Sequence, residues 1–157
     1  MRKRDGLWIA GAVLILDRIT KILSFSLPEA GLVLIPGVVR LRPVRNEGIA
    51  FSLLSGKPWL LGILSLAVIL AAGWYLRKKR MSRTVTAGLM MMLGGAVGNM
   101  IDRFFLGYVP DMIELLFVNF AVFNAADAFL TAGCALVIGC LLFQKEEPHG
   151  GHGRENH

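Results

Sequence analysis

Residues 123–143 have the sequence FNAADAFLTAGCALVIGCLLF, a nearly continuous apolar run with two polar side chains, Asn124 and Asp127, at its start. A helix needs about 20 apolar residues to cross the hydrocarbon core of a bilayer, so this run is long enough to span a membrane. An acid inside such a helix costs about 2.5–3.5 kcal/mol on insertion scales and usually marks a functional site. The stretch therefore predicts a membrane helix and raises the question of what Asp127 does in it.

The composition of the whole chain also indicates a membrane protein. Of its 157 residues, 55% are hydrophobic and 18% are charged, and the mean hydropathy is +0.60. We expect an all-α membrane protein with four transmembrane helices in one domain over residues 1–144. The predicted spans lie at about 7–26, 58–76, 84–101 and 122–143.

Basic residues cluster beside the apolar segments, at 1–4 (MRKR) and 77–83 (RKKRMSR), and they explain the net charge of +6 without a nucleic-acid partner. Such clusters are typical of cytoplasmic flanks, and four spans place both termini on that side. Residues 27–57 and 102–121 then face outward. Four basic residues of the first outer loop oppose this orientation: Arg40, Arg42, Arg45 and Lys57. We expect the compact clusters to dominate.

The two outward segments differ in pattern. Residues 32–44 (LVLIPGVVRLRPV) are rich in β-branched residues broken by proline and glycine, which predicts short strands and a turn. We therefore expect a small extracytoplasmic β-rich domain at about 27–57, resting on the membrane. Residues 104–123 are apolar enough to suggest a fifth span, but Pro110 and Asp111 favour a partly buried connection.

Cysteine and histidine usage narrows the possible chemistry. Cys134 and Cys140 lie in the last span without CxxC spacing and are expected to be inert thiols. The three histidines lie in the polar tail at 145–157, which we expect to be disordered; a metal site there is a minor alternative. Because the spans contain no histidine, catalysis there must use Asp, Glu, Lys, Ser or Tyr. We expect no cofactor and no catalytic metal.

Polar side chains at helical spacing mark the membrane region. Asp17 and Lys21 are four residues apart, with the acid first, and should neutralise each other; a direct chemical role for Lys21 is the alternative. Asn124 and Asp127 are three residues apart and share a helix face. The same spacing recurs near the end of the third span, at Asn99 and Asp102.

Antiparallel packing of the last two spans brings both Asn-x-x-Asp units near the outer surface, with Asp111 in the connection between them. Three carboxylates are therefore expected to converge there, and the small residues around them allow close helix contact. Two close carboxylates share a proton, so that one activates water while the other polarises a peptide carbonyl. This is aspartic protease chemistry, which needs no cofactor. A polar cluster that only holds helices together is the alternative.

Five motifs follow in order along the chain: DRITK at 17–21, NEGIAFS at 46–52, GGAVGNMIDR at 94–103, VPDMIE at 109–114 and FNAADAF at 123–129. With these motifs the chain resembles the lipoprotein signal peptidases (signal peptidase II), which are intramembrane aspartic proteases of bacteria. The resemblance covers nearly everything except the tail. Two features depart from the family pattern: Pro110 precedes the catalytic-type aspartate, and the link from Asp111 to Asp127 is short.

The resemblance implies an aspartic endopeptidase that removes the signal peptide from diacylglyceryl-modified prolipoproteins by cutting just before the lipidated cysteine. Asp111 and Asp127 match the family's catalytic pair. The positions that match the substrate site are Asn46, Gly48, Asn99, Arg103 and Asn124. The positions that match supporting residues are Asp17, Lys21, Gly95, Asp102 and Ala126.

The resemblance also implies a multi-pass protein of the bacterial cytoplasmic (inner) membrane, with its active site near the outer face and membrane lipid around it. A monomer is expected, as is inhibition by globomycin-like cyclic peptide antibiotics. The main alternative function is a small polytopic transporter or proton-relay protein, whose acids should be spread across the membrane depth. A serine–lysine peptidase using Ser52 or Ser55 with a lysine, and a non-catalytic assembly protein, are further alternatives.

Overall fold

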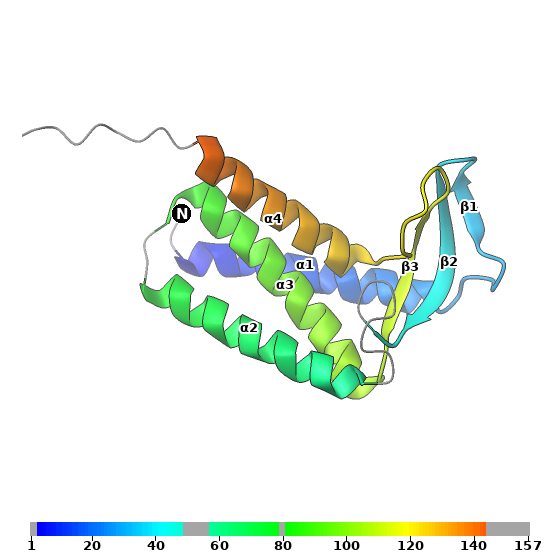
Figure 1. Ribbon diagram of the computed structural model, residues 1–157, viewed down its shortest axis with the longest axis horizontal. Helices are drawn as coiled ribbons and strands as arrows, with labels where there is room; N and C mark the ends of the chain where they lie inside the picture. Colours follow the sequence, from blue (N-terminus) through cyan, green and yellow to red (C-terminus); the bar gives the residue numbers. More distant parts are fainter. Residues whose placement is uncertain (1–2, 49–56, 79–80, 144–157) are drawn as a thin grey trace, which may run out of the picture.

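The computed structural model describes residues 3–48, 57–78 and 81–143. In these residues helices and strands occur in the order α1, β1, β2, α2, α3, β3, α4 (Figure 1). The helices are α1 (Lys3–Ser24), α2 (Pro58–Lys78), α3 (Arg83–Phe105) and α4 (Ala125–Phe143). The strands are β1 (Leu32–Ile35), β2 (Val39–Asn46) and β3 (Val109–Leu115). Each predicted span corresponds to one helix, with boundaries shifted by a few residues.

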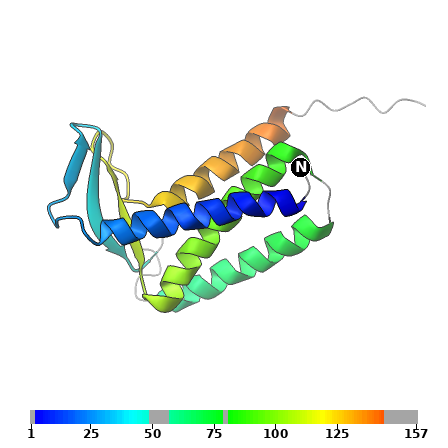
Figure 2. The same cartoon turned by 180° about the vertical axis from the view of Figure 1, so that it is seen from behind.

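The helices lie side by side, and α3 contacts each of the other three (Figures 1 and 2). Glycines on α3 make this possible because they replace side chains at the closest approaches. A Cβ added to Gly94 would lie 2.6 Å from the Ala10 carbonyl oxygen of α1, and one added to Gly95 would lie 2.6 Å from the Ala126 carbonyl oxygen of α4. Small residues at such contacts are typical of helices packed within membranes.

The outer surface of the helices is apolar, and much of the interior is polar. Large side chains such as Trp8, Leu70 and Phe143 are exposed. Polar and charged residues, including Asp17 and Asn124, are instead fully buried. Within the described residues, α3 and α4 are long and apolar enough to cross a membrane, and α2 contains a shorter apolar stretch, Pro58–Trp74.

A three-stranded antiparallel sheet in the order β1-β2-β3 lies at one end of the helices (Figures 1 and 2). The predicted hairpin is present, since β1 and β2 are joined by a turn in which Gly37 has a φ of +73°. β2 is irregular between Leu41 and Val44, where its register with β3 shifts. Pro43 lies in this irregular stretch, where a ladder hydrogen bond is not required.

The third strand was not predicted. Part of the segment expected as a partly buried connection forms β3, so the β-rich unit combines the loop between α1 and α2 with the connection between α3 and α4. Pro110 is accommodated because β3 lies at the edge of the sheet, where proline is tolerated. After β3 the chain reverses direction before α4 begins. Ile113 and Phe123 exchange backbone hydrogen bonds of 2.8 and 3.0 Å across this reversal. This return brings residue 124 beside Asp111, so the link is short but sufficient.

Candidate active site

Two buried polar clusters lie near the sheet end of the helices. The first, which we term the cation cluster, contains Asp17, Arg18, Lys21 and Asp102. Lys21 Nζ lies 2.9 Å from Asp17 Oδ1 and 2.6 Å from Asp102 Oδ2. Arg18 contacts the same two carboxylates at 2.7 and 2.5 Å. The expected ion pair between Asp17 and Lys21 is present, and each acid has two cationic partners.

Arg18 was missed by the sequence reasoning, although it lies within the DRITK motif. Its guanidinium also donates to the Gly98 carbonyl oxygen at 3.0 Å, so it links α1 to α3. Adjacent residues on a helix do not share a face, which is why helical spacing did not pair Arg18 with Asp17. Its length lets it reach past that restriction, and its position next to an acid was the available signal.

The second cluster, which we term the amide cluster, contains Asn46, Asn99, Asp111, Asn124 and Asp127. Asp111 accepts hydrogen bonds from Asn124 Nδ2 at 2.6 Å and from Asn46 Nδ2 at 2.8 Å. Asp127 accepts one from Asn99 Nδ2 at 2.8 Å. Among the described residues, no ion pair reaches either carboxylate, so both are held by neutral amides.

The two polar residues at the start of the last predicted span cap helix α4. Asn124 immediately precedes α4; its side chain accepts a hydrogen bond of 3.1 Å from the Asp127 N–H. The Asp127 carboxylate in turn accepts one of 3.3 Å from the Asn124 N–H. This is the reciprocal pattern of a capping box, which satisfies backbone donors that a helix N-terminus leaves free. Asp127 therefore lies in the first turn, at the end of the span.

The expected convergence of three carboxylates is wrong for Asp102. Asp102 faces α1 and belongs to the cation cluster, whereas Asp111 and Asp127 belong to the amide cluster. Asn99 connects the two clusters, because its Oδ1 accepts from Lys21 Nζ at 2.8 Å while its Nδ2 donates to Asp127. Two residues three apart on a helix differ in direction by about 60°, which is enough to face different neighbours.

Asp111 is buried, with 1% of its surface exposed. Burial raises the pKa of its carboxyl to about 6, and the nearby charge of Asp127 acts in the same direction. The amide donors Asn124 and Asn46 lower the pKa in part. Gly48 orients Asn46, since its N–H donates to Asn46 Oδ1 at 3.0 Å and leaves the amide nitrogen to face Asp111. Asp111 is therefore a carboxyl that can exchange a proton near neutral pH.

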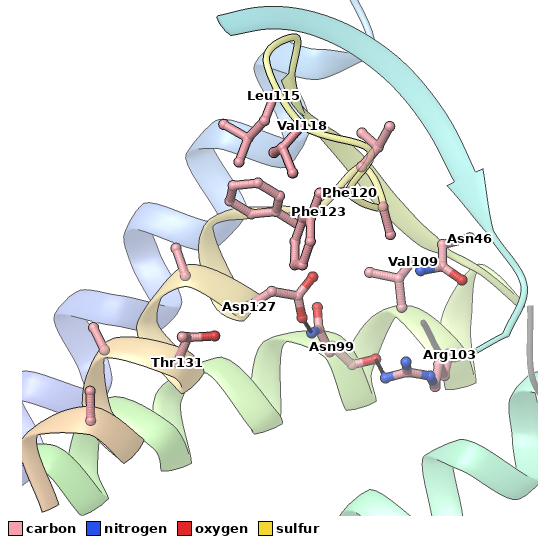
Figure 3. A pocket seen from close by; sticks show the side chains of 15 residues that line it. Asn46, Asn99, Arg103, Val109, Leu115, Val118, Phe120, Phe123, Asp127 and Thr131 are labelled. Carbon is pink, nitrogen blue, oxygen red and sulfur yellow. Dashed lines mark hydrogen bonds between the residues drawn. The ribbon is translucent and has the colours of Figure 1, made fainter. Parts of the chain in front are cut away.

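A cavity of 560 Å³ opens beside Asp127 (Figure 3). Its polar wall is formed by Asn46, Asn99, Arg103 and Asp127. The rest is mostly apolar, with aromatic and small side chains that the sequence reasoning did not select: Phe120, Phe123, Ala128, Ala132 and Ala135. Such a cavity, apolar with a few convergent polar groups, is typical of ligand sites.

The remaining predicted residues lie around this site. Arg103 donates to the Asn99 carbonyl oxygen at 3.3 Å and lines the cavity. Gly95 lies against Ala126, whose N–H donates to Asp17 Oδ1 at 3.2 Å. Gly95 and Ala126 therefore connect α3, α4 and the cation cluster directly behind Asp127.

Some of the predictions concern residues that the structure does not describe. Ser52, Ser55 and the tail at 145–157 lie outside the described residues. Among the residues that are described, no group of three His, Cys, Asp or Glu side chains could hold a metal ion.

An apolar helical surface, a polar interior and two amide-bound carboxylates, of which Asp127 lines an apolar cavity, are together typical of a membrane enzyme. Comparison with known proteins identifies the family of this enzyme. The family model described as Signal peptidase (SPase) II matches residues 9–143. A lipoprotein signal peptidase of a Nostoc species is 41% identical over 98% of this chain and 99% of its own. One from Streptococcus thermophilus is 44% identical over 75% of this chain and 76% of its own. The chain belongs to the signal peptidase II family and is a membrane protease.

Solved structures agree with this assignment. One described as a bacterial membrane enzyme, determined by the in meso method at 2.3 Å, has a TM-score of 0.83 and 30% identity, covering 91% of this chain and 93% of its own. A second, at 1.9 Å, has a TM-score of 0.80 and covers 90% and 94%. The arrangement of helices and sheet is therefore shared with experimentally determined membrane enzymes.

Proposed function

We propose that this protein removes the signal peptide from diacylglyceryl-modified bacterial prolipoproteins by cutting just before the lipidated cysteine. Asp111 and Asp127 form the catalytic pair and share a proton. The substrate class follows from the family, whose curated members are lipoprotein signal peptidases. The assignment of the catalytic pair is carried by one observation: Asn124 donates to both carboxylates, through its side-chain amide to Asp111 and through its backbone N–H to Asp127.

The environment of the two carboxyls supports this role. Both accept hydrogen bonds from neutral amides, which orient them without fixing their charge. Burial raises the pKa of Asp111 to about 6, so it can hold the shared proton while Asp127 stays charged. The carboxylates of the cation cluster have the opposite environment, because each is neutralised by Lys21 and Arg18.

The reaction follows from these roles. The Asp127 carboxylate takes a proton from water, and the water oxygen bonds to the scissile carbonyl carbon. The Asp111 proton moves to the carbonyl oxygen, which gives a neutral tetrahedral intermediate. The C–N bond then breaks as Asp127 donates its proton to the departing amine of the cysteine. The carbonyl re-forms and returns a proton to Asp111, which restores the starting state.

The cavity supports entry of a lipid-bearing substrate from the bilayer, because its wall is largely apolar and its amide and charged side chains lie together on one side. Asn46, Asn99 and Arg103 would contact the substrate, with Gly48 orienting Asn46. The predicted substrate residue Asn124 is buried and would instead act by holding the two aspartates. We propose that all four helices cross the bacterial inner membrane, with the sheet at the outer face and both termini cytoplasmic. The basic flanks at 1–4 and 77–83 support this orientation. Residues 1–144 would act as a single monomeric domain, open to cyclic peptide inhibitors of the globomycin type.

The proposal is tested by replacing each aspartate with its amide in purified protein, in lipid or detergent, with a lipid-modified prolipoprotein as substrate. Asp111→Asn and Asp127→Asn should each lower the cleavage rate by about 10²–10⁴-fold, because each removes a proton donor or acceptor. Glu114→Gln is the matched control: it is also an acid-to-amide change on β3, but Glu114 pairs with Arg40 and Arg42 outside the amide cluster.

The thermal unfolding midpoint of every variant separates lost chemistry from lost folding. Full activity in either aspartate variant would contradict the catalytic pair. An equal loss of cleavage rate in Glu114→Gln, with an equally lowered unfolding midpoint, would show that any acid on β3 is needed for folding. That result would remove the support for a specific role of Asp111.

A further inference from the structure

Thr131 is the one hydroxyl among the described residues that line the cavity. It lies on α4 four residues after Asp127, on the same wall (Figure 3). Beyond it along α4 the lining residues are Ala132 and Ala135. A single polar group is therefore placed in the apolar part of the cavity.

The Thr131 hydroxyl also differs from three other hydroxyls in the described helices. Hydroxyls within membrane helices commonly bond to a carbonyl of the preceding turn. Thr20, Ser65 and Thr86 each do so, at 3.0, 2.8 and 2.9 Å. Thr131 is exposed and makes no hydrogen bond within the described part of the chain. Its hydroxyl is thus available to a ligand in the cavity.

The substrate of the proposed reaction needs such a partner. A peptide entering a protease site must be extended around the scissile bond, so its backbone N–H and C=O groups are not paired within a helix. In an apolar cavity each unpaired group costs several kcal/mol. The alanines of α4 offer nothing to these groups, whereas the Thr131 hydroxyl can both donate and accept a hydrogen bond.

The spacing between Asp127 and Thr131 indicates which backbone group of the substrate would lie beside the Thr131 hydroxyl. Four residues of helix advance about 6 Å, and two residues of extended peptide advance about 6.6 Å. From Asp127, α4 runs away from the sheet, as Figure 1 shows. The signal peptide is the membrane-embedded, amino-terminal side of the substrate, so it would run in the same direction from the scissile bond.

We propose that the Thr131 hydroxyl hydrogen-bonds to a backbone group of the signal peptide two residues before the residue that supplies the scissile carbonyl. This inference rests on the proposed function and adds a substrate-binding residue to it. Because the bond is to the backbone, it holds the extended strand in register for substrates with different signal-peptide side chains.

The test compares Thr131→Val, which keeps the shape but removes the hydroxyl, with Thr131→Ser, which keeps the hydroxyl. Thr131→Val should lower kcat/KM for the lipid-modified substrate by about tenfold, mainly through KM, since a bond made equally in ground and transition states affects binding. Thr131→Ser should stay close to the unchanged protein. Thr86→Val is the control, because that hydroxyl is satisfied by the Ser82 carbonyl oxygen.

A second measurement uses a substrate in which an ester replaces the amide at the contacted position. If Thr131 binds that group, the ester and Thr131→Val should not have additive effects. Additive losses, an unchanged kcat/KM in Thr131→Val, or an equal loss in Thr131→Ser would each overturn the inference. If Thr131→Val is fully active while Asp127→Asn is inactive, only this inference fails. An active Asp127→Asn would overturn the proposed function as well.

Discussion

The two polar clusters contain the same number of aspartates but treat them differently. In the cation cluster, Asp17 and Asp102 are each bound by Arg18 and Lys21. In the amide cluster, Asp111 and Asp127 accept hydrogen bonds from neutral amides and backbone N–H groups. The clusters are neighbours, since Asn99 bonds to both.

This difference supports the proposed division between structural acids and reactive ones. A buried carboxylate between two cations is neutralised by them and holds helices together. A buried carboxylate held by amides keeps its geometry but can still change its protonation state. Breaking the cation cluster should therefore reduce mainly stability, and perturbing the amide cluster should change mainly the chemistry and its pH dependence.

The largest effect on stability is expected for Lys21→Met. It leaves Asp17 and Asp102 buried with only Arg18 between them, and removing one partner of a buried ionic group costs about 3–5 kcal/mol. Thermal unfolding of the purified variant would measure the loss. Combining Asp17→Asn with Lys21→Met restores the balance of charge and should recover part of the stability. If the double variant is less stable than Lys21→Met, charge compensation is not what the cluster provides.

A smaller loss of stability is expected for Gly95→Ala, at the contact between α3 and α4 behind Asp127. An added Cβ at Gly95 would lie 2.6 Å from the Ala126 carbonyl oxygen and 3.1 Å from Leu130 Cγ. Gly95→Ala should therefore displace α4, at a cost of about 1–3 kcal/mol, and lower activity because Asp127 moves with it. Gly139→Ala is the matched control, since nothing lies within 4 Å of its added Cβ. An unchanged cleavage rate in Gly95→Ala would show that the amide cluster tolerates this displacement.

The smallest effect is a shift in pH dependence on Asn46→Ala. Asn46 donates to the charged form of Asp111 and so lowers its pKa; without this donor the pKa should rise further above its present value of about 6. The protonated form then persists to higher pH, and the fall in kcat/KM with rising pH should move upward by about one unit. The pH profile of cleavage measures this. Arg42→Gln, on the same strand, should leave unchanged the pH at which kcat/KM falls. A shift of that pH to a lower value in Asn46→Ala would contradict the assignment.

The helices were predictable because their information is local. Apolar runs of sufficient length gave all four to within a few residues, and the Pro36–Gly37 turn gave the first hairpin. The pairing of Asp17 with Lys21 followed from their spacing on one helix. Much of the candidate site was also accessible, because Asn124 and Asp127 form a capping box within four residues of sequence.

The parts that were missed depend on distant contacts. β3 carries a proline and two acids, and it is a strand only because β2 supplies its partner, with Asn46 and Asp111 lying 65 residues apart in sequence. Helical spacing wrongly predicted that Asp102 would converge with Asp111 and Asp127, because the direction it faces depends on which neighbouring helix carries the cations. The Thr131 hydroxyl became notable only when the structure showed that no backbone group in the described residues bonds to it.

The order of the elements along the chain has a consequence for biosynthesis. Asp111 lies in β3, whereas Asn124 and Asp127 lie at the start of α4, the last helix described. During translation, a chain that has formed only its first three helices has no Asp127 and no Asn124 between the two aspartates. Under the proposed function, proteolytic capacity would arise only when the final helix is in place, so an unfinished copy could not cleave lipoprotein precursors that emerge beside it.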